Sequence, residues 1–183
     1  RITELGDRTL LDLDTHAVER TLAGLGAFIV MEDVQIRDVS GQTHRLALHG
    51  PNGPGILGEV STLVAGPPLS DLKQGDACVV SVGGREVTVD RDASTGEIGL
   101  VPLMRLEEAL PVAMRLIEAG REHSGDGPAA KLRLRPAGWH AFNIARIEAG
   151  RPLYNIDFGP DSFAHETGIL HDRGSFKKGS YLG

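Results

Sequence analysis

The residues best suited to chemistry lie in ARIEAGRPLYNID, residues 145–157. Glu148 stands just before Gly150, where we expect a helix to end. A carboxylate there opposes the helix dipole at a cost of about 0.3–1 kcal/mol, whereas Arg146 is favourably placed. Glu148 therefore has two interpretations: it pairs with an arginine on the surface, or it faces a cavity and accepts two N–H donors from a ligand. Charge alone favours the surface pair.

A second candidate is HGPNGPG, residues 49–55, because a glycine-rich turn that leads into a helix can bind phosphate. The stretch lacks the lysine and Ser/Thr of a P-loop, and its glycine spacing differs from a dinucleotide fingerprint. Asn52 as N-cap and Pro54 in the first turn explain the segment by structure alone. We favour that interpretation.

Other reactive side chains are not arranged in known catalytic or metal-binding patterns. The seven histidines contain no i, i+4 pair, so we expect surface histidines and no metal site. No serine stands in a G-x-S-x-G nucleophile elbow, and the catalytic residues stay unassigned. Cys78 is the single cysteine and lies in the apolar run ACVVSV, which predicts a buried, inert thiol.

Composition excludes several classes of protein. The 183 residues carry 19 basic and 25 acidic side chains, a net charge of -6, which argues against a nucleic-acid surface. No apolar run reaches the roughly 20 residues that cross a bilayer. One cysteine rules out an internal disulfide, so a reducing cytoplasm is the expected compartment.

The elements that must position these residues follow from periodicity and turn chemistry. Strands are expected at RITEL and TLLDLD around Gly6-Asp7, at DVQIRDVS and THRLALHG, on both sides of Gly83-Gly84, and at GLVPL. Helices are expected after a cap at Asp14 or Thr15, after Asn52 through Val64, from Leu106 to Ala119 with Pro111 as a kink or late start, and over GWHAFNIARIEAG, residues 138–150. Strand pairs separated by helices predict an α+β fold of ferredoxin-like, mainly antiparallel units. We expect one domain over residues 1–183, with a subdomain join near 65–76, a loop by composition.

Several stretches, in order along the chain, resemble the folate-binding family that joins the glycine cleavage T-protein (aminomethyltransferase) to the YgfZ-type proteins. GWHAFNIARIEAG followed by LYNID is similar to the T-protein segment G-L-G-A-R-D-S-L-R-L-E-A-G followed by L-Y-G, FAHETGIL to P-x-E-x-G-L, and LALHGPNG to the strand-to-helix step L-x-G-P. RDASTGEIGL resembles R-T-G-Y-T-G-E-D-G-F and keeps Arg91, Thr95, Gly96, Glu97 and Gly99. KKGSYLG resembles the YgfZ signature K-G-C-Y-x-G-Q-E and keeps Lys178, Gly179, Tyr181 and Gly183.

The resemblance implies ferredoxin-like halves around a central tetrahydrofolate site. It makes Glu148 the expected pterin ligand, since a reduced pterin presents a ring N–H beside an exocyclic amino group and one carboxylate can accept from both. Tyr154, Glu166 and Arg146 are the further expected folate contacts. Tyr154 would supply a stacking face, although an ordinary half-buried tyrosine explains it equally well.

Three departures bear on chemistry. Phe142 and Asn143 replace the Arg-Asp of the T-protein pattern, and Ala93-Ser94 replace its Gly-Tyr. Ser180 stands where the YgfZ signature has cysteine, which removes any thiol chemistry. The resemblance also implies family strands before Arg1, an upstream catalytic aspartate and a barrel-like domain after the signature, so we expect a domain incomplete at both ends.

Three functions stay open. The first is a tetrahydrofolate-binding YgfZ-like protein with an accessory role in iron–sulfur cluster maintenance or tRNA modification, favoured by KKGSYLG. The second is a T-protein-like aminomethyltransferase that moves a one-carbon unit onto tetrahydrofolate, favoured by TGEIG; this is the activity expected if the protein is an enzyme. The third is a structural domain that has lost folate binding. The expected partners are a folate and a protein of iron–sulfur assembly or glycine cleavage, with neither membrane nor nucleic acid.

Overall fold

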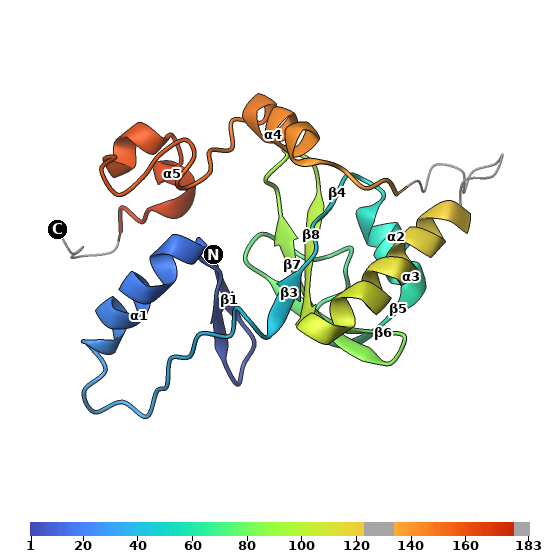
Figure 1. Cartoon of the computed structure of the whole chain (residues 1–183), viewed down its shortest axis with the longest axis horizontal. Coiled ribbons are helices and arrows are strands. Elements are labelled where there is room, and N and C mark those ends of the chain that lie inside the picture. The colour runs from blue at the N-terminus through green and yellow to red at the C-terminus, as the bar shows by residue number, and fades with distance from the viewer. Residues whose placement is uncertain (123–133, 178–183) are drawn as a thin grey trace.

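The computed structural model describes residues 1–122 and 134–177 and begins with a small unit formed by a hairpin and a helix (Figure 1). Gly6 turns the hairpin at φ +86°, and the Asp14 carboxylate caps the following helical turn by accepting from the His16 N–H at 2.9 Å. Both features agree with the sequence prediction. The unit contains β1 (Ile2–Glu4), β2 (Thr9–Leu11), the 3₁₀ helix η1 (Thr15–Ala17) and α1 (Val18–Gly26).

A 6-stranded sheet forms the centre of the molecule, in the order β3-β8-β7-β6-β5, with β4 also paired to β8. All paired strands in the described residues run antiparallel, which confirms the predicted α+β class with antiparallel units. The glycine pair 83–84, at φ +57° and +80°, makes the predicted hairpin turn. The strands are β3 (Thr43–Arg45), β4 (Leu48–His49), β5 (Ser61–Ala65), β6 (Ala77–Val82), β7 (Arg85–Asp92) and β8 (Gly99–Arg105).

The core lies between this sheet and two helices, α2 (Gly53–Val60) and α3 (Ala109–Glu122). Pro111 falls in the first turn of α3, after the 3₁₀ helix η2 (Leu106–Glu108), so the late start is the correct alternative. The buried side chains of the cluster are Leu48, Ile56, Leu57, Leu72, Cys78, Val80, Val82, Val87, Val89, Leu100, Met104, Val112, Leu116 and Ala119.

Two sequence predictions are wrong. Residues 33–40, expected as a strand, form no ladder, because no neighbouring strand in the described residues pairs with them. Leu63 and Val64, expected on the second helix, belong to β5, because the chain turns extended at Ser61 (φ −130°, ψ 158°) and pairs with β6. The tertiary ladder overrides a stripe that also suits a strand.

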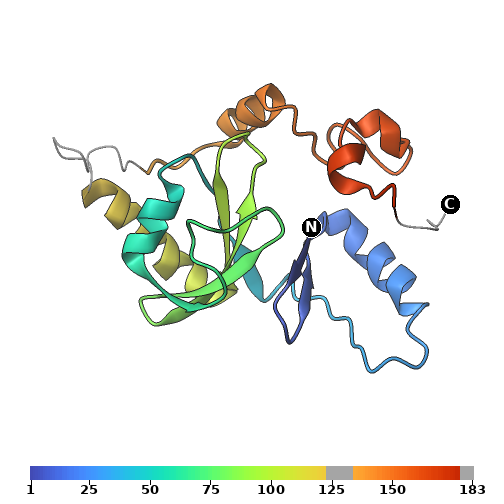
Figure 2. The same cartoon turned by 180° about the vertical axis from the view of Figure 1, so that it is seen from behind.

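The C-terminal part begins with α4 (Trp139–Glu148) and continues into the short helices η4 (Ala164–Thr167) and α5 (Leu170–Arg173). Gly150 ends α4 as predicted, at φ +63°, because its N–H donates to Ile147 O and the Arg151 N–H donates to Arg146 O. In both views α4 lies over the ends of β7 and β8, and the η4–α5 segment lies beside the N-terminal unit (Figures 1 and 2). None of the described helices has the length and apolar character that a membrane crossing requires.

Candidate functional site

Two buried aspartates occupy the face of β7 that points away from the helical core. Side chains alternate along a strand, so Val87 and Val89 enter the core while Asp90 and Asp92 lie on the opposite face. They are only 5% and 6% exposed. A buried carboxylate is costly unless it is paired, and its partners therefore determine what it can do.

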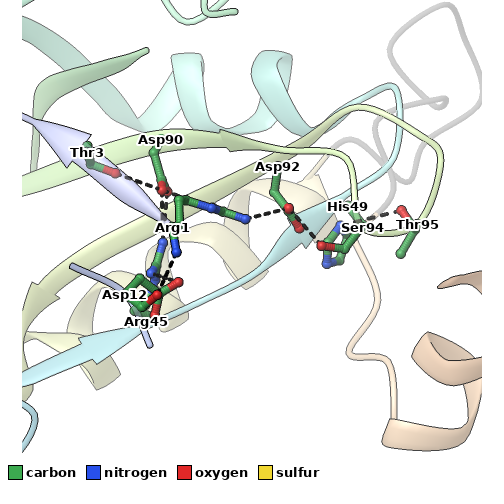
Figure 3. Close-up of polar contacts among 9 residues, drawn as sticks. All are labelled: Arg1, Thr3, Asp12, Arg45, His49, Asp90, Asp92, Ser94 and Thr95. Atoms are coloured by element: carbon green, nitrogen blue, oxygen red, sulfur yellow. Dashed lines mark hydrogen bonds and ion pairs between the residues drawn. The ribbon is translucent and has the colours of Figure 1, made fainter. Parts of the chain in front are cut away.

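Arginines from the N-terminal unit and from β3 neutralise these carboxylates (Figure 3). Arg1 bridges them, with one guanidinium nitrogen 2.9 Å from Asp90 Oδ2 and the other 2.5 Å from Asp92 Oδ1. Arg45 pairs with Asp90 at 3.0 Å and also with Asp12. The network clamps the N-terminal unit to the sheet, because each buried charge has an opposite charge within contact distance.

Asp92 is ionised within this network. Burial alone would raise the pKa of its carboxyl group, but the hydrogen bond from the Ser94 hydroxyl at 2.7 Å and the positive charge of Arg1 outweigh it and lower the pKa. Ser94 donates to Asp92, so its hydroxyl is not activated by a histidine. The cluster thus has the character of a structural clamp rather than of a nucleophilic triad.

His49 lies at the end of β4, directly opposite Gly99 of β8. Its ring packs against Phe142 of α4, with centroids 5.6 Å apart and planes tilted by 35°. Nδ1 is 3.5 Å from Thr95 Oγ1, and Nε2 is buried without a hydrogen-bond partner in the part of the chain that the structure describes. Burial lowers the pKa of the imidazole. The expectation that the histidines lie on the surface is wrong for this one.

The loop 93–98 meets the C-terminal end of α4. Gly96 has φ +78°, and a Cβ atom built on it would lie 2.9 Å from the Ala149 Cβ. The TGEIG stretch and the IEAG stretch, far apart in sequence, are therefore in direct contact. Glu148, next to Ala149, is exposed, and its side chain forms no ion pair or hydrogen bond within the described residues. Its carboxylate oxygens are therefore available to a ligand.

Arg146, in contrast, is engaged internally. It is 3% exposed, and its guanidinium donates to Asn143 Oδ1 at 2.7 Å and to Asp157 Oδ2 at 2.5 Å. Asp157 also accepts from the Leu153 N–H at 2.6 Å. This hydrogen bond contributes most to lowering the pKa of the Asp157 carboxyl group, and Arg146 contributes less. This pair fixes the turn after α4, so any role of Arg146 toward a ligand would compete with the pair.

Tyr154 lies half-buried in that turn, in edge contact with Phe158 at a centroid distance of 5.7 Å. The neighbouring Asn155 has φ +63°, and its side-chain amide donates to Asp14 Oδ1 at 2.8 Å. The turn is thereby tied to the N-terminal unit. A stacking role for Tyr154 stays a prediction.

Glu166 is exposed in η4, where its carboxylate accepts from the Phe163 N–H at 3.0 Å. That contact caps the short helix. No described contact joins Glu166 to Glu148 or Tyr154, so their grouping in one site stays a prediction. The signature residues Lys178, Gly179, Ser180, Tyr181 and Gly183 lie outside the described residues.

A cavity of about 750 Å³ lies between the N-terminal unit, residues 33–40 and the face of the sheet that carries Asp90. Its lining is largely apolar, with Asp90, Arg45 and Thr88 at the sheet. Glu148, Tyr154, Glu166 and Arg146 do not line it. Within residues 1–122 and 134–177 no group of three or more His, Cys, Asp or Glu side chains is arranged to hold a metal ion.

Sequence reasoning did not single out Asp90, Asp92 or Arg45. One pattern could have found the aspartates: in REVTVDRD the polar residues alternate with valines, which places Thr88, Asp90 and Asp92 on the face opposite the core. No local pattern predicts their pairing with Arg1, because Asp90 and Asp92 stand 89 and 91 positions away from Arg1 along the chain.

Comparison with known proteins finds one family model, described as the GCVT N-terminal domain, that matches residues 6–171. The match covers the N-terminal unit from the turn at Gly6 onward, the sheet, α4 and most of the C-terminal segment. It therefore includes both stretches that meet at Gly96 and Ala149.

Curated relatives carry the name aminomethyltransferase. The protein of Thermus thermophilus is 32% identical over 145 residues, which are 79% of this chain and 37% of that protein. The protein of Halalkalibacterium halodurans is 32% identical over 168 residues, 89% of this chain and 41% of its own length. The chain thus spans about two-fifths of the length of the curated relatives it matches.

Proposed function

Because the chain belongs to the GCVT N-terminal domain family, we propose that it is the tetrahydrofolate-binding part of an aminomethyltransferase-type protein that moves a one-carbon unit onto the folate. The names of the curated relatives support this choice over an iron–sulfur accessory role. A folate and a protein of glycine cleavage that delivers the one-carbon unit are the partners that this proposal requires. One domain over residues 1–183, with a join near 65–76, is part of the same proposal.

One observation carries the proposal: α4 ends against the TGEIG loop and leaves the carboxylate of Glu148 exposed beside it. A reduced pterin offers two adjacent N–H donors, and an ionised carboxylate can accept both in a bidentate, charge-assisted pair. Glu148 fits that donor set because its side chain has no competing partner in the described residues. The reduced pterin, when bound, would supply the nitrogen that accepts the one-carbon unit.

The test is calorimetric titration of tetrahydrofolate, or its 5-formyl form, into the full-length protein and into Glu148→Ala. Hydrogen bonds to a charged group contribute about 1.5–3 kcal/mol each, so loss of both with the carboxylate should weaken binding by roughly 10²- to 10⁴-fold. Glu118→Ala is the matched control, because it removes the same side chain from an exposed glutamate on α3, away from the site. No binding to the intact protein refutes the function, whereas unchanged binding by Glu148→Ala refutes only the site.

The YgfZ-like accessory role is the second candidate. KKGSYLG favours it, as does the presence of Phe142 and Asn143 where the T-protein pattern has Arg-Asp. Here Phe142 packs on His49 and Asn143 accepts from Arg146, so both serve internal contacts. An aminomethyl-transfer assay on the folate-binding protein separates the two candidates: transfer supports the enzyme, and binding without transfer supports the accessory role. The third alternative, a domain without ligand, predicts no heat of folate binding.

A further inference from the structure

We propose that His49 is a positioning residue: its ring packs against Phe142 and so determines where α4 places Glu148. Neither His49 nor Phe142 belongs to the predicted folate contacts, and Phe142 departs from the T-protein pattern. The inference rests on the proposed folate function, which it deepens by naming what holds the ligand-binding helix end.

Two contacts, one toward each end of α4, join the helix to the end of the sheet. Toward the start of the helix, Phe142 packs on His49 at 5.6 Å and on Trp139 at 5.5 Å, which makes a stack of three rings. At the other end, Ala149 meets Gly96. A short helix behaves as a rigid rod, so two contacts near its ends set its direction and the place of Glu148.

The His49 ring is itself held in place. A Cβ atom on Gly99 would lie 2.9 Å from His49 Nδ1 and 2.9 Å from the Asp92 carbonyl oxygen, so the ring occupies the space that a side chain at position 99 would need. Thr95 Oγ1 lies 3.5 Å from Nδ1 on the loop that also carries Gly96. The ring therefore connects β4, the 93–98 loop and α4.

This arrangement needs a neutral imidazole. The imidazolium form has an N–H on both ring nitrogens, so Nε2 would be a buried, charged donor with no acceptor in the described part of the chain. The charged groups that act on the ring are Asp92 of β7, which raises its pKa, and Arg1, which lowers it; burial is the largest influence and also lowers it. Phe142 from α4 and Thr95 from the loop face the ring without charge. Protonation on acidification should therefore loosen the stack.

The chain offers a matched control. His171 and Phe176 form a similar ring pair, with centroids 5.5 Å apart and planes tilted by 40°. This pair is exposed and lies at α5, away from α4. The same substitution at His171 removes the same kind of contact without affecting how α4 docks.

The experiment titrates 5-formyltetrahydrofolate into full-length wild type, His49→Leu, Phe142→Leu, the double variant and His171→Leu, with each variant's folding checked by its thermal midpoint. Loss of an aromatic pair should raise the Kd roughly 3- to 10-fold in each single variant at α4. The double variant should show no further increase, because both substitutions remove the same contact. His171→Leu should bind like wild type. Unchanged binding by folded His49→Leu and Phe142→Leu, or effects that multiply in the double variant, would overturn the inference.

Two more readouts exclude a general loss of structure. His49→Phe keeps a ring but cannot take a proton. It should therefore bind folate like wild type at pH 7.5 and not show the weaker folate binding that wild type shows toward pH 5.5; a retained pH dependence counts against His49.

The difference in fluorescence emission between each protein and its Trp139→Phe derivative isolates the signal of Trp139, which is 57% exposed. Without ligand, an altered Trp139 emission in His49→Leu supports the docking and an unaltered one refutes it. If the wild type binds no folate, the proposed function is refuted. The change in Trp139 emission in His49→Leu then tests by itself whether His49 positions α4.

Discussion

The contact between Gly96 and Ala149 makes Gly96→Ala a demanding test of the candidate site. The new methyl group has two costs. An L-residue in the left-handed region loses about 1–2 kcal/mol, and Gly96 has φ +78°. The methyl group would also stand 2.9 Å from the Ala149 Cβ, and such overpacking costs about 1–3 kcal/mol. We expect a total loss of roughly 2–5 kcal/mol in the free energy of unfolding.

Two further variants separate these costs. Gly84 has φ +80° with nothing within 4 Å of its added Cβ, so Gly84→Ala measures the backbone cost alone. Ala149→Gly removes the atom that the new methyl group would meet, at its own cost of about 0.5–1 kcal/mol. If the contact exists, the double variant Gly96→Ala with Ala149→Gly should lose about 1–3 kcal/mol less than the sum of the single losses.

The assay is urea unfolding of the full-length protein, analysed by linear extrapolation, together with folate titration at 25 °C. Losses that add to within about 0.5 kcal/mol would mean that the loop and the helix end do not touch. A loss for Gly96→Ala equal to that for Gly84→Ala would lead to the same conclusion. Folate binding should fall with Gly96→Ala and recover in the double variant, because the displaced helix end carries Glu148.

Three other expectations follow from single contacts. Asp157→Asn leaves the buried guanidinium of Arg146 without its carboxylate, so the urea midpoint should fall at neutral pH; because the pKa of Asp157 is lowered, its contribution disappears as pH falls through that pKa, and wild type and variant should converge in acid. Asn155→Gly keeps φ +63° and loses only the hydrogen bond to Asp14, whereas Asn155→Ala should cost about 1–2 kcal/mol more in unfolding measurements. Burial raises the pKa of the Cys78 thiol to about 11, so a disulfide reagent at pH 8 should label it only as the protein unfolds; rapid labelling of the native protein would contradict this.

Local sequence signals predicted much of the fold. The Gly83-Gly84 turn, the cap at Asp14 and the stop at Gly150 were predictable because each depends on the conformational preference of one or two residues. The strand expected at 33–40 was wrong for the opposite reason: alternation is typical of a strand, but a ladder also needs a neighbouring strand to pair with. Leu63 and Val64 failed because an apolar stripe suits a helix and a strand alike, and pairing with β6 decided between them.

The candidate site divides in the same way. The sequence by itself determined that Glu148 would stand at a helix end, since the stop at Gly150 follows from neighbouring residues. Only the tertiary structure decided that the loop and the helix end meet, that Arg146 turns inward to Asp157, and that His49 supports Phe142. These contacts join residues far apart along the chain, and their partners are selected by the packing of the sheet and not by any local preference.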